Sequence, residues 1–120
     1  MTGEIKETEH LISSRRIEGT PVYNIAGERL GSVEHFMVDK VSGQAAYAVL
    51  SFGGVLGIGH HHYPLPWDIL AYDKQRGGYV VDVDKDAIEQ APSFDPDQAP
   101  EFTRDYGDEL YGYYGVVNSY

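Results

Sequence analysis

The stretch Ser51-Phe-Gly-Gly-Val-Leu-Gly-Ile-Gly-His-His-His-Tyr-Pro-Leu-Pro-Trp-Asp68 contains four glycines, three histidines, two prolines and the only tryptophan of the 120-residue chain. Glycine is favoured where the backbone takes a positive φ or passes close to another segment. A glycine-dense bend that leads into a short strand ending in Pro66-Trp67 is therefore typical of a tight corner in a small β structure. The residues expected to have structural roles here are Gly53, Gly54, Gly57, Gly59, Pro66 and Trp67.

The length of 120 residues fits one small domain with flanking segments. The chain has no cysteine, which excludes a disulfide framework, a thiolate nucleophile and a cysteine-based zinc site. Its first ten residues are polar and acidic, without the apolar region of a signal peptide. The longest apolar run, 45–50, is far shorter than the roughly 20 residues of a transmembrane helix. We expect a soluble, cytoplasmic protein.

The chain has a formal net charge of −10, and most of this charge lies in its second part. The residues from Asp82 onward contain ten acidic side chains against only Lys85 and Arg104, which gives that segment −8 and leaves −2 for the first 81 residues. An acidic surface repels phosphate groups, so direct binding to nucleic acid is disfavoured. The same repulsion disfavours an anionic membrane surface. The simplest interpretation is a solvated acidic flank that aids solubility.

Short apolar runs between turn residues predict a mainly β fold, a small barrel or curled sheet without long helices. The strands are expected over 21–23, 30–39 with a bulge, 44–52 with both faces buried, 60–65 and 79–83. One short helix is expected over 84–91 after the last strand, with Asp84 as its N-cap and Pro92 at its end.

A series of motifs follows in order along the chain. They are Gly19-Thr-Pro-Val-Tyr23, Gly27-Glu-Arg-Leu-Gly-Ser-Val33, Val38-Asp39, Gly43-Gln44, Ser51-Phe-Gly-Gly54, Leu56-Gly-Ile-Gly59, Pro66-Trp67, Tyr79-Val-Val-Asp-Val-Asp84 and Ala91-Pro92. Over residues 11–95 this series resembles the PRC-barrel domain, which is named from the cytoplasmic domain of the photosynthetic reaction centre H subunit. Each piece alone is a weak signal, whereas the ordered series is specific.

The resemblance implies a small, strongly bent β-barrel that acts mainly as a protein-binding module. In the H subunit this domain caps a membrane complex and influences quinone-linked electron and proton transfer, and a related barrel in a ribosome maturation factor assists ribosome assembly. We expect neither the transmembrane helix of the first nor the RNA-linked N-terminal domain of the second, and the chain resembles stand-alone bacterial members of the family. We expect a leader over 1–15, the barrel domain over 16–92, and a Pro/Asp-rich connector with an extended Tyr/Gly-rich tail over 93–120.

His60, His61 and His62 form the one cluster with metal-ligand chemistry in the sequence. On a strand, His60 and His62 would share a face and could hold Zn²⁺ or Ni²⁺ if a third ligand joined them. The nearest candidates for that ligand are His35 and Asp68. Clustered imidazoles could also sense pH near neutrality. The simpler alternative is a polar strand face with solvated histidines.

No catalytic arrangement stands out. The glycines between Gly53 and Gly59 lack the Lys-Ser/Thr pair and the following helix of a phosphate-binding loop. Asp84, Asp86 and Glu89 could hold Ca²⁺ only weakly, because they lack the glycine and the bidentate glutamate of an EF-hand loop. We therefore expect no enzymatic activity, no catalytic or cofactor-binding residues and no cofactor.

Tyrosines interleaved with glycines near the C-terminus are typical of adaptable contact surfaces. The predicted interaction residues are Tyr106, Tyr111, Tyr113, Tyr114 and Tyr120. We expect the tail to dock on its own barrel or on a neighbouring copy of the chain, and a disordered tail is the alternative.

The function expected from these observations is a non-enzymatic protein-interaction module that self-associates, as a homodimer or larger assembly, and binds a further, unknown protein. The first alternative is a metal- or pH-responsive regulator that uses His60 and His62. The second, which rests on the resemblance alone, is an assembly or electron-transfer-associated factor of a photosynthetic or ribosome-maturation complex.

Overall fold

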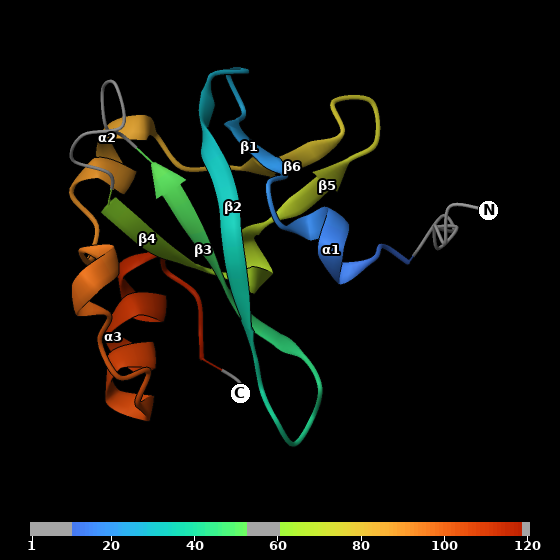
Figure 1. Cartoon of the computed structure of the whole chain (residues 1–120). Helices are drawn as coiled ribbons and strands as arrows, with labels where there is room; N and C mark the ends of the chain where they lie inside the picture. Colours follow the sequence, from blue (N-terminus) through green and yellow to red (C-terminus); the bar gives the residue numbers. More distant parts are fainter. Residues whose placement is uncertain (1–10, 53–60, 119–120) are drawn as a thin grey trace.

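One strongly bent sheet of six strands forms the centre of the molecule in the computed structural model, which describes residues 11–52 and 61–118 (Figure 1). The strands are β1 (Pro21–Asn24), β2 (Arg29–Val38), β3 (Ala45–Phe52), β4 (His61–Pro66), β5 (Ala71–Asp73) and β6 (Gly78–Val81). Their order across the sheet is β4-β3-β2-β1-β6-β5. β1 and β6 run parallel, and the other neighbouring pairs are antiparallel.

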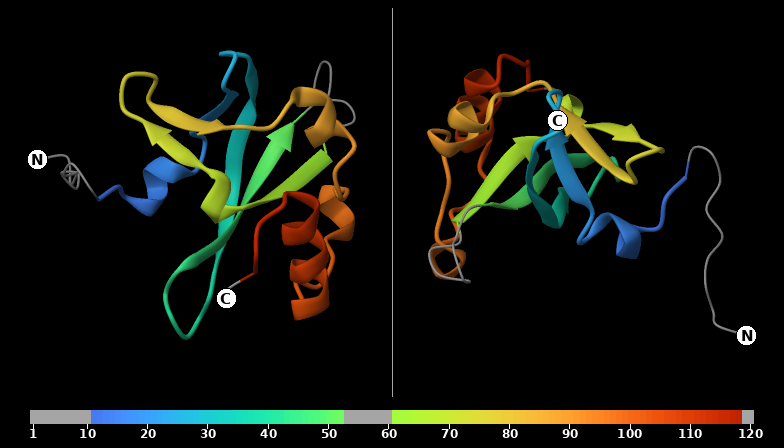
Figure 2. Two further views of the ribbon diagram at one scale, coloured as in Figure 1. Left: turned by 180° about the vertical axis from the view of Figure 1, so that it is seen from behind. Right: turned by 90° about the horizontal axis from the view of Figure 1, so that it is seen from above.

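The sheet is bent but not closed, because its outermost strands, β4 and β5, do not pair with each other within the described residues. β5 and β6 cross the direction of β2 steeply, and the view from above shows the same curvature (Figures 1 and 2). The predicted mainly β, strongly bent, barrel-like fold is confirmed. No helix in the described part of the chain is long and apolar enough to span a membrane.

The main hydrophobic core draws residues from five of the strands. Its least exposed members, each at most 1 % exposed, include Val22, Val33, Leu50, Leu65 and Val81. Burying one such aliphatic side chain stabilises the fold by about 1.5–3 kcal/mol. The bent sheet is therefore a firm support for the segments that pack on its outside.

β3 is buried on both faces, as its small apolar residues predict. Leu50 and Phe52 pack in the main core. Tyr47, in contrast, belongs to a second cluster with Leu110 and Tyr111, which come from the C-terminal part of the chain. The sequence predicts that β3 has two covered faces, but it does not say which segment covers the second one.

β2 is irregular at two points, between Val33 and His35 and between Met37 and Val38, where its register with β3 shifts. The bulge predicted in this run is therefore confirmed. The second shift leaves Ala46 of β3 without a paired residue on β2.

Five helical segments accompany the sheet. They are α1 (Ser14–Ile17), η1 (Trp67–Ile69), α2 (Lys85–Glu89), η2 (Pro96–Gln98) and α3 (Arg104–Tyr113). α1 is not foreseen from the sequence, although Ser13 caps it through its side chain and Ile17 is buried. Ile12 packs against the main core, whereas Leu11 is 70 % exposed.

The helix expected over 84–91 is present in a shorter form as α2. Asp84 is the N-cap residue, as predicted, but its side chain does not make the expected capping hydrogen bond. Ile88 is fully buried in the main core. Burial of this one residue, more than capping, holds the short helix in place.

The extended C-terminal tail is the main correction to the sequence prediction, because residues 104–113 form α3. Gly107 and Gly112 lower the intrinsic helix propensity of this segment by about 1 kcal/mol each relative to alanine. Leu110 and Tyr111 are at most 3 % exposed and pack against Tyr47 of β3. Tertiary packing therefore overrides a composition that favours coil.

Both ends of α3 have side-chain or backbone caps. At its start, the Thr103 hydroxyl oxygen accepts a hydrogen bond from the backbone N–H of Tyr106 at 3.1 Å. At its end, Gly115 has φ +74° and the N–H of Val116 donates to the carbonyl oxygen of Tyr111 at 3.0 Å. This pattern is a Schellman motif, in which glycine takes the left-handed conformation that other residues rarely adopt.

Candidate functional site

The outer edge of β4 is closed to further strand pairing. His62 and Phe94 exchange two backbone hydrogen bonds of 2.9 and 3.0 Å, so the segment after α2 lies along this edge. Pro64 and Pro66 follow His62 at intervals of two residues, so their backbone nitrogens face the same edge of the strand as that of His62. Neither proline has an N–H to donate. The segment 93–103, which we call the connector, therefore covers the edge, and the prolines remove the remaining donors.

A series of ring contacts joins the sheet to α3 across the connector. The ring centroids are 6.2 Å apart for His35 and His62, 5.5 Å for His62 and Phe94, and 6.2 Å for Phe94 and Phe102. Phe102 then contacts Tyr106 of α3 at 5.2 Å. Edge-to-face pairs of this kind contribute about 0.5–1.5 kcal/mol each beyond their buried area. The rings fix the position of an otherwise polar segment.

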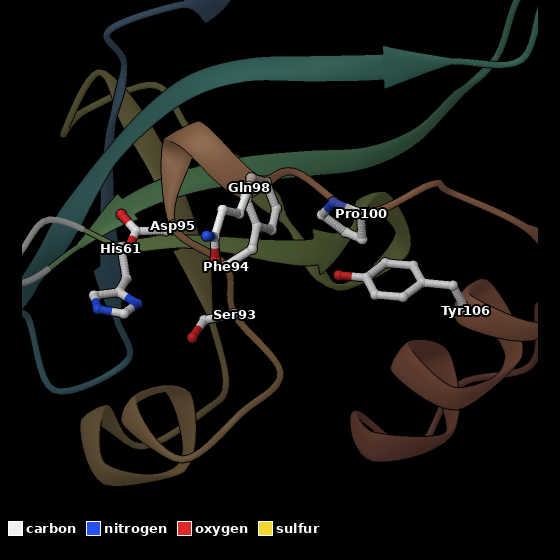
Figure 3. Close-up of a pocket in the computed structure, with 7 residues that line it drawn as sticks. All are labelled: His61, Ser93, Phe94, Asp95, Gln98, Pro100 and Tyr106. Carbon is white, nitrogen blue, oxygen red and sulfur yellow. The ribbon is translucent and has the colours of Figure 1, made fainter.

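A surface pocket of about 420 Å³ lies where β4, the connector and α3 meet (Figure 3). It is lined by His61, Ser93, Phe94, Asp95, Gln98, Pro100 and Tyr106. Phe94, Pro100 and Tyr106 are partly buried, whereas His61, Ser93, Asp95 and Gln98 are exposed. Figure 3 shows Tyr106 reaching from α3 with its hydroxyl group toward Pro100. The pocket therefore combines an apolar, aromatic side with a polar rim.

The surroundings of the pocket are strongly acidic. Residues 93–109 contain six carboxylates against Arg104 alone, a net charge of −5. The exposed carboxylates are Asp95, Asp97, Glu101, Asp105, Asp108 and Glu109. Among the described residues, Asp95, Asp97 and Glu101 form no ion pair. Their charges therefore give the solvent side of this segment a negative potential, and Asp95 among them lines the pocket.

Two tyrosine hydroxyl groups attach α3 to the rest of the molecule. Tyr111 donates to the backbone carbonyl oxygen of Ala46 at 2.6 Å, and Ala46 has no paired residue on β2 or β4. Tyr113 donates to the carbonyl oxygen of Ala87 in α2 at 2.5 Å. The helix that borders the pocket is thus held by directional bonds as well as by packing.

Tyr114 is different, because its hydroxyl oxygen is buried and has no hydrogen-bond partner in the described part of the chain. Burial raises the pKa of Tyr114 above the ordinary tyrosine value, and repulsion from ionised Tyr113, Tyr63 and Tyr106 raises it further. A buried polar group without a partner loses its hydrogen bonds to water and gains none in the protein, which costs about 1–3 kcal/mol.

Opposite effects on stability are expected for two matched substitutions in this part of the chain. Tyr111→Phe should lower the free energy of unfolding by about 1–3 kcal/mol, because it leaves the Ala46 carbonyl oxygen buried without a donor. Tyr114→Phe should leave stability unchanged or raise it by about 1 kcal/mol, because it removes a buried group that has no partner. Urea unfolding of both variants measures the difference, and a loss of equal size in both would contradict it.

The pH dependence of the stability of Tyr114→Phe provides a further check. A folded-state pKa above the unfolded-state value gives a contribution to stability that is fully present below the unfolded pKa and is lost as pH rises through the folded pKa. Tyr114 should therefore add to the fall in stability that begins at about pH 10, where exposed tyrosines ionise. Tyr114→Phe should make that fall shallower relative to the wild type.

The predicted histidine site is only partly described. His60 lies outside the described residues. The ring of His62 lies beside His35, one of the two expected third ligands, whereas Asp68 is exposed on η1. Within residues 11–52 and 61–118, no group of three or more His, Asp or Glu side chains is placed to hold a metal ion. Metal binding by His60 and His62 stays a prediction.

The other predicted residues are spread over several environments. Gly53, Gly54, Gly57, Gly59 and Tyr120 lie outside the described residues. Pro66 is fully buried, and Trp67 is half-buried at the edge of the main core. The Trp67 ring centroid lies 6.0 Å from that of Phe36 and 5.6 Å from that of Tyr79.

The predicted interaction tyrosines do not form one surface. Tyr111 is buried under its own sheet, Tyr114 is partly buried, and Tyr113 is 44 % exposed. Of the tyrosines that are described, only Tyr106 lines the pocket. Sequence reasoning missed the pocket residues of the connector, for which the available signal was two isolated phenylalanines, Phe94 and Phe102, in a polar run.

Comparisons with known proteins identify a family. No curated protein matches the sequence. The sequence profile of the PRC-barrel domain matches residues 9–88. This match covers more than half of the chain and contains all six strands of the sheet. The chain belongs to the PRC-barrel domain family.

Proposed function

We propose that the chain is a non-enzymatic protein-interaction module that binds a different protein through the surface formed by β4, the connector and α3. PRC-barrel domains are small domains often found in protein interactions. The observation that carries the proposal is the pocket between these three segments, which pairs partly buried aromatic rings with exposed polar groups. Interfaces commonly combine an aromatic centre with a polar rim in this way.

The charge of this surface supports a different protein over a second copy as the occupant. Two copies that met through it would bring together two segments of net charge −5. Like charges across an interface disfavour association. Self-association remains a prediction, and the opposite edge of the sheet suits it better, since β5 is a terminal strand and Tyr72 there is 44 % exposed.

The other predicted functions have less support. A metal- or pH-responsive role would use His60 and His62, and its support is that the ring of His62 contacts that of His35, one of the expected third ligands. A role as an assembly or electron-transfer-associated factor in a photosynthetic or ribosome-maturation complex rests on the family resemblance alone. The cytoplasm is the expected location on the grounds of the sequence.

Site-specific photo-crosslinking in the source cell tests the proposal. A photoreactive residue in place of Ser93, at the pocket rim, should give a crosslinked product with a distinct protein. The same residue in place of Gln75, in the turn between β5 and β6, should not give that product. Mass spectrometry identifies the crosslinked peptide.

Three outcomes would contradict the proposal: only crosslinked homodimers from position 93, the same products from both positions, or no product from either. Thermal unfolding of each variant checks that the fold is intact before the crosslinking is interpreted.

A further inference from the structure

We infer that the pocket recognises an arginine or lysine side chain in a basic segment of the partner protein. This inference rests on the proposed function and names the chemistry of its partner. A cationic group that enters the pocket meets the carboxylate of Asp95 and the rings of Phe94 and Tyr106. Carboxylates pair with guanidinium and ammonium groups, and aromatic faces attract the same cations.

The apolar lining matches the rest of such a side chain. Pro100, Phe94 and Tyr106 can cover the methylene groups of arginine or lysine while the charged end reaches the polar rim. A purely apolar side chain would leave Asp95 and Gln98 without a matching partner. An acidic side chain would be repelled.

The charge around the pocket extends the preference from one side chain to a basic segment. Asp97 and Glu101 flank the pocket in the connector, are exposed and form no ion pair among the described residues. Arg104 is the single cationic residue between positions 93 and 109. Basic residues next to the inserted one would meet carboxylates on the rim, and this complementarity speeds association at low salt.

Binding of a defined peptide to the full chain tests the inference. The probe is a short, fluorescently labelled peptide of Arg, Lys, Gly and Ser, and the matched control peptide carries Glu in place of every Arg and Lys. Anisotropy is measured at about pH 8, above the range in which imidazole groups ordinarily take up protons. The basic peptide should bind, more weakly as salt is raised, and the acidic one should not.

Two charge-matched variants then locate the binding. Gln98→Lys puts a cation into the pocket lining, whereas Gln75→Lys adds the same charge at an exposed position in the turn between β5 and β6. Gln98→Lys should weaken binding of the basic peptide roughly fivefold or more, and Gln75→Lys less than about twofold. Asp95→Asn and its control Asp68→Asn each remove one exposed carboxylate. Asp95→Asn should weaken binding of the basic peptide more than Asp68→Asn does.

The inference is overturned by any of three results: the basic peptide does not bind, both peptides bind equally, or the two lysine variants weaken binding equally. The last result would show attraction to the net charge alone. If Ser93 still crosslinks to a distinct protein in that case, the proposed function stands without this partner chemistry. If crosslinking fails as well, both are wrong.

Discussion

Gly31→Ala is expected to destabilise the protein by about 3 kcal/mol or more, because a Cβ at this position would overlap the backbone carbonyl oxygen of Ser51. Gly31 pairs with Val22 of β1 and with Phe52 of β3, so three strands approach each other closely at this point of the bent sheet. Neither neighbouring backbone can move away without breaking the pairing. Urea unfolding measures the loss.

Two further glycines make this expectation testable even if Gly31→Ala does not fold. At Gly78 a Cβ would lie 2.5 Å from the carbonyl oxygen of Pro21, so Gly78→Ala should be milder but still destabilising. At Gly112 on α3 a Cβ would meet nothing within 4 Å, and Gly112→Ala should stabilise the protein by about 0.5–1 kcal/mol. Equal stability of Gly31→Ala and wild type would contradict the described packing.

Leu110→Ala should lower the free energy of unfolding by about 2–5 kcal/mol, because Leu110 is 1 % exposed in the cluster that covers the outer face of β3. Val117→Ala, at a position that is 84 % exposed, is the matched control and should stay within about 0.5 kcal/mol of wild type. Chemical unfolding of both variants measures the difference.

The concentration dependence of this loss separates two arrangements of α3. Because Leu110 packs on the sheet of its own chain, the loss should be the same at low and high protein concentration. A loss of stability that disappears at high protein concentration would place α3 between copies of the chain. That result would support docking of the tail on a neighbouring copy instead of on its own barrel.

Five of the six strands could be predicted because their signals are local, whereas β5, with three residues, was not among the expected strands. β3 consists of small apolar residues, and the turn before it contains Gly43, which has φ +76°. The bulge in β2 was visible as an imperfect alternation of apolar residues. α1 and the exact extent of α2 were not predicted, because helices of four and five residues depend on one buried side chain each, Ile17 and Ile88.

The pocket could not be predicted, because its two sides are far apart in the sequence. His61 and Tyr106 come from β4 and α3, and the connector, which leads from α2 to α3, has no regular pattern of its own apart from its prolines and acidic residues. The sequence predicts an acidic flank that is exposed to solvent. The structure adds that part of it surrounds a pocket with aromatic walls.

The sequence by itself determined the family, the order of the strands along the chain and the acidic character of the C-terminal part, since these depend on local residue patterns and on charge. Only the tertiary structure decided that the tyrosine-rich tail folds as α3, that Phe94 closes the edge of β4, and that a pocket forms between them. The physical reason is that the tail has little helix propensity of its own. Its conformation follows from the apolar face of β3, which needs a cover, and from the Ala46 carbonyl oxygen, which needs a donor.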